Sequence, residues 1–147
     1  MNKLLYVPVL LAVLSCASAG DGAGERWTAE EANEWYDSHR WIAGCNFIPS
    51  YAINQLEMWQ ENTFDADVID RELGWAEELG FNCMRVFLHH LLWETDRDGF
   101  IDRIDRYLDI SSGHGISTMF VFLDDCWNEK YAPGKQPEPQ RGVHNSG

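Results

Sequence analysis

The structural class of the chain follows from residues 81–88, which read FNCMRVFL. This run is apolar at most positions and has the length of one strand buried on both faces. A helix is predicted directly before it, because Asp65 is a suitable N-cap and Gly80 suits the left-handed position that ends many helices. A buried strand that follows an amphipathic helix is typical of α/β proteins.

Two more apolar runs, residues 41–47 and 116–123, lie on either side of residues 81–88. Helical periodicity separates the three runs, so we expect a parallel sheet with right-handed crossovers, in the α/β class. The runs begin about 40 and 35 residues apart, as in a (β/α)8 barrel or a doubly wound sheet. The chain has no G-x-G-x-x-G or G-x-x-x-x-G-K-S/T motif, which counts against a nucleotide-binding sheet.

The helices are predicted from their caps and apolar spacing. Thr28 and Glu31 match a capping box at the start of a helix of about ten residues. The apolar positions after Asp65 form a broad stripe: Val68, Ile69, Leu73, Trp75, Ala76 and Leu79. A third helix begins near Phe100 and should end at residues 113–115, which read GHG. Three tryptophans on apolar stripes are expected in the core: Trp35, Trp41 and Trp75.

The composition limits the partners of the chain. Its 147 residues include 11 Lys and Arg against 24 Asp and Glu, a formal net charge of -13, so nucleic acid would be repelled over most of the surface. With 45% hydrophobic residues, the chain can form one domain with a core and is not a disordered acidic tail. Neutral sugars are not repelled, and the aromatic residues supply rings on which sugars can stack.

The N-terminus has the pattern of a secretory signal peptide. A positively charged start precedes the apolar residues 4–14, and residues 17–19 (ASA) form a small-x-small cleavage site. Residues 1–19 are therefore expected to be removed on export. The apolar stretch is too short to span a bilayer, for which about 20 residues are needed. Residues 13–16 (VLSC) also approximate a bacterial lipoprotein signal, which leaves a lipid anchor at Cys16 as an alternative.

The remaining cysteines, Cys45, Cys83 and Cys126, are odd in number and have no C-x-x-C spacing. Neither a disulfide framework nor a zinc site is therefore predicted. Buried free thiols are the expected state of all three.

Polar and aromatic side chains follow the ends of the predicted strands, where binding and catalysis are built in α/β sheets and barrels. The substrate-binding candidates are Asn46 at the end of the first strand, His89 and Trp93 after the second, and Asp124, Asp125 and Trp127 after the third. Arg85 lies inside the second, otherwise apolar strand, where a charged side chain is costly unless it is paired. It is either part of a structural ion pair or an active-site residue that orients a carboxylate or the substrate. Side-chain alternation predicts that Arg85 and His89 share one face and that His90 points to the other.

Several segments carry a resemblance to a known family: residues 41–50 (WIAGCNFIPS), 52–60 (AINQLEMWQ), 80–82 (GFN) with 85–89 (RVFLH), and 142–147 (GVHNSG). They are similar to segments of secreted bacterial glycoside hydrolases of the cellulase-like kind, in family five of clan A, some of which are labelled β-1,4-xylanases. The resemblance covers residues 26–147, and the run NQLEMW is fairly specific.

The resemblance implies that residues 20–147 form about three β/α units at the start of a (β/α)8 barrel. It implies that the full-length protein hydrolyses O-glycosidic bonds in a β-linked polysaccharide (xylan, glucan or mannan). The family's mechanism is retaining and uses an acid/base Glu and a nucleophile Glu about 5 Å apart. No cofactor is implied.

In the family the two catalytic glutamates end the fourth and seventh strands, so both are expected beyond Gly147. The 147 residues alone are therefore expected to be inactive and poorly folded. Arg85 matches the family's strand-two arginine, which hydrogen-bonds the nucleophile and keeps it ionised.

Two other functions remain open from the residues. His89 with Asp124 or Asp125 could form a divalent-metal site of a barrel hydrolase. Alternatively, the barrel could bind polysaccharide without hydrolysing it, through Trp93 and Trp127.

Overall fold

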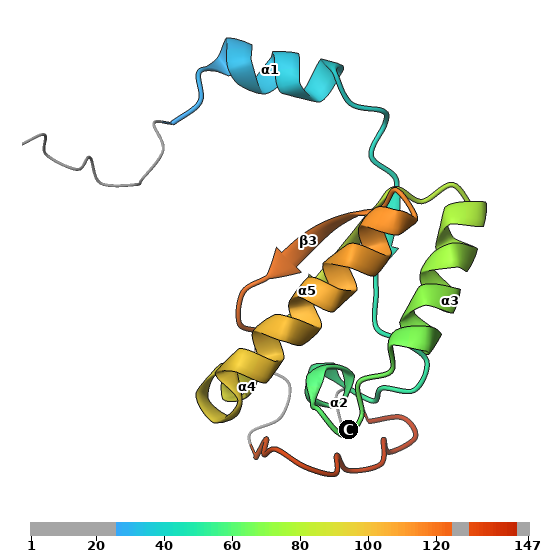
Figure 1. Ribbon diagram of the computed structural model, residues 1–147, viewed down its shortest axis with the longest axis vertical. Coiled ribbons are helices and arrows are strands. Elements are labelled where there is room, and N and C mark those ends of the chain that lie inside the picture. The colour runs from blue at the N-terminus through green and yellow to red at the C-terminus, as the bar shows by residue number, and fades with distance from the viewer. Residues whose placement is uncertain (1–25, 125–129, 144–147) are drawn as a thin grey trace, which may run out of the picture. The chain divides into compact units, whose positions relative to one another are not determined.

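The structure, a computed structural model, describes residues 26–124 and 130–143 (Figure 1). The predicted signal peptide lies outside the described residues, as do Cys16, Asp125, Cys126 and Trp127. The chain divides into two compact units, residues 1–38 and 39–147. Within the described ranges, no helix is both long and apolar enough to cross a membrane.

The described part of the first unit is helix α1 (Ala29–Asp37), whose N-terminus confirms the predicted capping box. The Glu31 N–H donates to Thr28 Oγ1 at 3.2 Å, and the Thr28 N–H donates to the Glu31 carboxylate at 2.8 Å. These hydrogen bonds satisfy two amide groups at the helix start that have no partner within the helix. The Thr28 N–H and the Thr28 hydroxyl, which both donate to the Glu31 carboxylate, lower the pKa of that carboxyl.

Within the described residues, the second unit is built on a three-stranded parallel sheet in the order β1-β2-β3. The strands are β1 (Gly44–Asn46), β2 (Cys83–Phe87) and β3 (Ser117–Val121). The register pairs Asn46 with Arg85 and Arg85 with Met119, so these three residues form one row across the sheet. A small parallel sheet whose strands alternate with helices along the chain agrees with the predicted α/β class.

Four helices accompany the sheet: α2 (Gln55–Trp59), α3 (Ala66–Glu78), α4 (His90–Thr95) and α5 (Arg97–Gly113). The two long helices, α3 and α5, lie side by side and cover one face of the sheet (Figure 1). Met84 and Val86 point to these helices and are fully buried, whereas Arg85 between them is exposed. In the part of the chain that is described, the other face of the sheet is therefore uncovered.

Trp59 at the end of α2 lies in the centre of the core and is fully buried. Its ring packs against Phe64, Phe100 and Tyr107 at centroid distances of 6.1, 5.9 and 5.5 Å. Its indole N–H donates to the carbonyl oxygen of Phe87 at 3.0 Å. The short helix α2, which periodicity did not predict, thus joins the long helix α5 to the end of β2.

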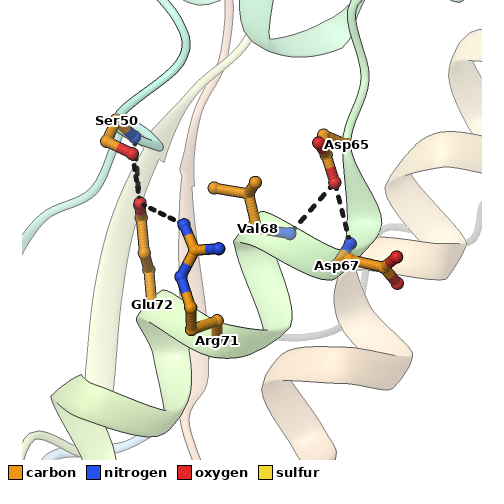
Figure 2. Close-up of polar contacts among 6 residues, drawn as sticks. All are labelled: Ser50, Asp65, Asp67, Val68, Arg71 and Glu72. Carbon is orange, nitrogen blue, oxygen red and sulfur yellow. Dashed lines mark hydrogen bonds and ion pairs between the residues drawn. The ribbon is translucent and has the colours of Figure 1, made fainter.

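The predicted caps around α3 are confirmed. Asp65 Oδ1 accepts from the N–H groups of Asp67 and Val68 at 3.1 and 3.0 Å (Figure 2). Gly80 follows the helix at φ +86, a conformation that favours glycine. The first strand also needs its glycine, because a Cβ at Gly44 would lie 1.7 Å from the Cys83 carbonyl oxygen.

All three strands are shorter than predicted. β1 begins at Gly44 rather than at Trp41, and β3 ends at Val121, after which Phe122 is 78% exposed and Leu123 has φ +67. The predicted strands were too long because apolar residues also lie before β1 and after β3. A residue belongs to a strand only if it pairs with a neighbouring strand, and hydropathy does not indicate such pairing.

The predicted burial of three tryptophans is wrong: Trp35, Trp41 and Trp75 are 44%, 80% and 54% exposed. On α3, the buried residues Ile69, Leu73 and Ala76 follow a narrower stripe than predicted. Trp75 is two positions from Leu73, a rotation of about 200° around the helix, so it points away from the sheet. The Arg71 guanidinium, one turn earlier, lies 5.3 Å from its ring centroid.

The cysteines were predicted to be buried. This prediction is wrong for Cys45, which is exposed, and holds only in part for Cys83, which is half-buried. Cys45 lies on β1, a strand that has a partner on one side only within the described sheet. Its Sγ lies 3.7 Å from Met84 Sδ, and both cysteines are free thiols.

Candidate functional site

The candidate site lies at the carboxyl ends of the strands, where the predicted residues occupy different elements. Asn46 is the last residue of β1, and Arg85 is the middle residue of β2. His89 precedes α4, Trp93 lies within α4, and Asp124 follows β3. Asp125 and Trp127 lie outside the described residues.

Arg85 is on the uncovered face of the sheet and contacts Asn46 and Phe87. Its Nη1 donates a long hydrogen bond of 3.3 Å to Asn46 Oδ1. Its guanidinium carbon lies 4.6 Å from the ring centroid of Phe87, a cation–π distance. Among the described residues, no carboxylate forms an ion pair with Arg85. The guanidinium is therefore oriented by an amide and a ring, and retains N–H groups that can bind a carboxylate or a hydroxyl.

His89 and His90 are adjacent in space as well as in sequence, which contradicts the predicted opposite orientation. Their rings stack at a centroid distance of 5.0 Å, and both contact the Tyr131 ring, at 4.9 and 5.4 Å. Strand alternation does not apply here because the strand ends at Phe87 and His90 begins α4.

His89 is 2% exposed, and its Nδ1 accepts from the Leu91 N–H at 3.2 Å. This hydrogen bond caps α4 and requires that Nδ1 carry no proton. His89 thus fixes the turn that follows β2, a structural contribution that the sequence alone did not suggest. Its role in substrate binding stays a prediction.

Asp124 is held through its backbone next to the end of β2. Its N–H donates to the Leu88 carbonyl at 3.2 Å, and its carbonyl accepts from Gln55 Nε2 at 2.5 Å. Helix α2 therefore lies beside the ends of both β2 and β3, because Trp59 reaches Phe87 and Gln55 reaches Asp124.

Sequence reasoning missed a group of buried amide side chains that attaches the C-terminal segment to α2. Asn54 Nδ2 donates to Gln136 Oε1 at 3.0 Å, and Gln136 Nε2 donates to the carbonyls of Ala132 and Gly134 at 3.0 and 2.8 Å. Gln60 Nε2 also donates to the Gly134 carbonyl, at 3.0 Å. Gln60 and Gln136 are 7% and 3% exposed. The amide residues at positions 54, 55 and 60 were visible in the sequence, but an amide pairing across 82 positions has no local pattern.

The loop after β1 is attached to α3 through Ser50. Its N–H and hydroxyl both donate to the Glu72 carboxylate, the former at 3.0 Å, and Arg71 Nη2 lies 3.6 Å from the same carboxylate (Figure 2). Tyr51 follows in the loop, and burial raises its pKa to about 12, so its hydroxyl stays protonated. That hydroxyl donates to the Met58 carbonyl at 3.2 Å. These contacts hold the loop between Asn46 and α2 in place.

Trp93 is 45% exposed on α4, and the Arg97 guanidinium carbon lies 4.3 Å from its ring centroid. A hollow of about 700 Å³ adjoins it, lined by Trp93, Glu94, Asp96, Arg97 and Asp98. Across residues 26–124 and 130–143, no group of three or more His, Cys, Asp or Glu side chains is arranged to hold a metal ion.

Comparison with known proteins yields no match: no family model, curated protein or solved structure is significantly similar to the chain.

Proposed function

We propose that the chain is the first part of a (β/α)8-barrel glycoside hydrolase that cleaves β-linked polysaccharide with retention of configuration. In this proposal β1, β2 and β3 are the first three barrel strands, and the uncovered face of the sheet is the barrel interior. The two catalytic glutamates belong to later strands of the barrel, as in the family that the sequence resembles. The protein is exported, in keeping with its N-terminal pattern.

The observation that carries the proposal is the position of Arg85. It lies on β2, the central strand of the described sheet, yet its side chain is exposed on the face opposite α3 and α5. A doubly wound sheet has helices on both faces, so its central strands are apolar on both sides. In a barrel, the corresponding face carries the polar residues that contact substrate near the carboxyl ends of the strands. A charged, oriented Arg85 therefore favours the barrel.

The chemistry of Arg85 suits a retaining mechanism. A guanidinium next to a carboxylate stabilises the ionised form and lowers its pKa, which a nucleophilic glutamate requires. Phe87 and Asn46 hold the guanidinium in one orientation before substrate arrives. The positive charge of Arg85 would then remain fixed near the nucleophile while negative charge leaves it.

The full-length protein, assayed on β-glucan, xylan and mannan, tests the proposal. We expect hydrolysis of one of these polymers, with the β-anomer as the first product in proton NMR. We expect Arg85→Ala to lower kcat/KM by about 10²- to 10³-fold. The acidic limb of its pH profile should move to higher pH, because the nucleophile loses its neighbouring positive charge.

Arg71→Ala is the matched control. Arg71 is also an arginine stacked on an aromatic ring, but it lies on α3, on the outer side of the sheet. Its removal should leave kcat/KM and the pH profile unchanged. An α-anomer as first product, no hydrolysis of any of the three polymers, or an Arg85→Ala variant as active as the Arg71→Ala variant would each contradict the proposal.

A further inference from the structure

The corner between α4 and α5 forms a second candidate binding site. Its hollow of about 700 Å³ is lined by the five residues Trp93, Glu94, Asp96, Arg97 and Asp98. The lining includes neither Arg85 nor Asn46, so the hollow is separate from the residues on the uncovered face of the sheet. The hollow is shallow and open to solvent over most of its extent.

The aromatic part of the hollow is the Trp93 indole, which is 45% exposed while the adjacent Leu92 is buried. Leu92 attaches α4 to the core, and the Arg97 guanidinium, 4.3 Å from the ring centroid, orients the indole. A flat, oriented and partly exposed indole can stack on the C–H face of a sugar ring without first losing much conformational freedom.

The polar part is also held in place. Arg103 Nη2 donates to Asp96 Oδ2 at 2.7 Å, while Arg103 Nε donates to the carbonyl of the buried Trp59 at 2.6 Å. The hydrogen bond from Arg103 lowers the pKa of the Asp96 carboxyl, so this group remains ionised near neutral pH. Gly99 permits the arrangement, because a Cβ there would lie 2.6 Å from an Asp96 carboxylate oxygen.

The charge of the hollow selects the class of ligand. Three carboxylates, of Glu94, Asp96 and Asp98, outnumber the guanidinium groups of Arg97 and Arg103. An anionic ligand would be repelled, whereas the hydroxyls of a neutral sugar can donate to carboxylates and accept from a guanidinium. The combination of indole, carboxylates and guanidinium therefore favours a neutral, polyhydroxylated ligand.

We propose that the hollow at the α4–α5 corner binds a neutral sugar unit of a glycan chain and rejects acidic sugars. This inference rests on the proposed function for the choice of a glycan as ligand. It adds a binding site away from Arg85 and a discrimination between neutral and uronic-acid polysaccharides.

The test is titration of the full-length protein, with ¹⁵N-labelled indoles, by cello-, xylo- and mannohexaose, followed by NMR. We expect the Trp93 indole N–H to shift with at least one of them, and Trp93→Ala to weaken the binding of that hexasaccharide at least about tenfold. Trp75→Ala is the control, because Trp75 is also exposed and stacked with an arginine, but on α3. The Trp75→Ala variant should bind the same hexasaccharide as tightly as the wild type.

A second arm tests the charge selection, with the Trp93 indole as the reporter and the carboxylates as the variable. Oligogalacturonate of the same length should not shift the Trp93 indole in the wild type, and should do so in the double variant Glu94→Gln/Asp98→Asn. Equal binding of the acidic and neutral oligomers by the wild type would overturn the inference, as would binding of every neutral hexasaccharide unchanged by Trp93→Ala.

The experiments distinguish a failure of this inference from a failure of the proposed function. Retaining hydrolysis that depends on Arg85, without a shift of the Trp93 indole, overturns the inference and leaves the proposed function standing. A Trp93-dependent shift in a protein without hydrolytic activity supports the inference and overturns the proposed hydrolysis.

Discussion

The indole N–H of Trp59 donates a 3.0 Å hydrogen bond to the carbonyl oxygen of Phe87, the last residue of β2. The two residues are 28 positions apart, and the bond forms inside the core, where Trp59 is fully buried. One side chain thus places α2 against the end of the central strand. The position of α2 matters for the site because its neighbours Asn54 and Gln60 hold the C-terminal segment.

Trp59→Phe should destabilise the protein by about 2 to 4 kcal/mol, because it removes a buried hydrogen bond and leaves unfilled volume among three aromatic rings. Denaturant unfolding measures the loss. Trp75→Phe, at a position 54% exposed, should change the free energy of unfolding by no more than about 0.5 kcal/mol. Equal losses in the two variants would show that the Trp59–Phe87 contact contributes little.

Gly44→Ala should disrupt the pairing of β1 with β2, since the new Cβ would overlap the Cys83 carbonyl oxygen. We expect a loss of more than about 2 kcal/mol in the free energy of unfolding. The comparison is Gly113→Ala at the end of α5, where a Cβ meets nothing within 4 Å. That substitution should be neutral or stabilise by up to about 1 kcal/mol. A stable Gly44→Ala variant would refute the close approach of the two strands.

His114 should make stability depend on pH in a predictable direction. Its Nδ1 and Nε2 contact Glu77 and Asp70 at 2.8 and 2.9 Å, and these hydrogen bonds raise its pKa above 6.5. Because the protonated form is favoured in the folded state, the contribution is complete below about pH 6.5 and is lost as pH rises through the raised pKa. Both carboxylates are exposed, so the effect should be below about 1 kcal/mol.

The measurement for His114 is the free energy of unfolding of the wild type and of His114→Gln between pH 5.5 and 9. The wild type should be the more stable at the acidic end, and the difference should shrink as pH rises. The Glu77→Gln substitution should bring the His114 pKa back toward 6.5, which an NMR titration of this variant measures. A difference that grows with pH would reverse the assigned sign.

Gln136→Ala should loosen the segment of residues 130–143 without unfolding the sheet, because it breaks the amide contacts to Asn54, Ala132 and Gly134. Hydrogen exchange of the Gly134 amide should accelerate by at least about tenfold, as expected for the loss of about 1 to 3 kcal/mol. Amides of β2 should keep their wild-type rates. Lys135→Ala, next to Gln136 but exposed, is the control and should leave the Gly134 rate unchanged.

Local patterns predicted several helix ends correctly. The capping box of Thr28 and Glu31, the cap at Asp65 and the left-handed Gly80 each depend on neighbours within three or four residues. Their hydrogen bonds are formed within one turn, so the residue types alone contain the information. The parallel α/β class was predictable for a related reason, since apolar runs and helical spacing alternate along the chain.

Local patterns failed where a partner came from elsewhere in the chain. Helix α4 reverses the orientation predicted for His90, and Trp75 projects outward although it was predicted to lie on the apolar stripe of its helix. In the candidate site, the sequence indicated Arg85 and Trp93, but not the stacking of Arg85 on Phe87 or of Trp93 on Arg97. Side-chain contacts of this kind depend on rotamers and on backbone turns that hydropathy does not describe.

The sequence by itself therefore determined the alternation of the strands with the longer helices, several helix caps, the charge of the chain and the residue types at the strand ends. Tertiary packing determined which face of the sheet is left uncovered, and hence that Arg85 is exposed while Met84 and Val86 are buried. It also brought Gln136 to Asn54 and Trp59 to Phe87. The physical reason is range: a cap is satisfied within one helical turn, whereas burial and long-range hydrogen bonds exist only once distant segments pack together.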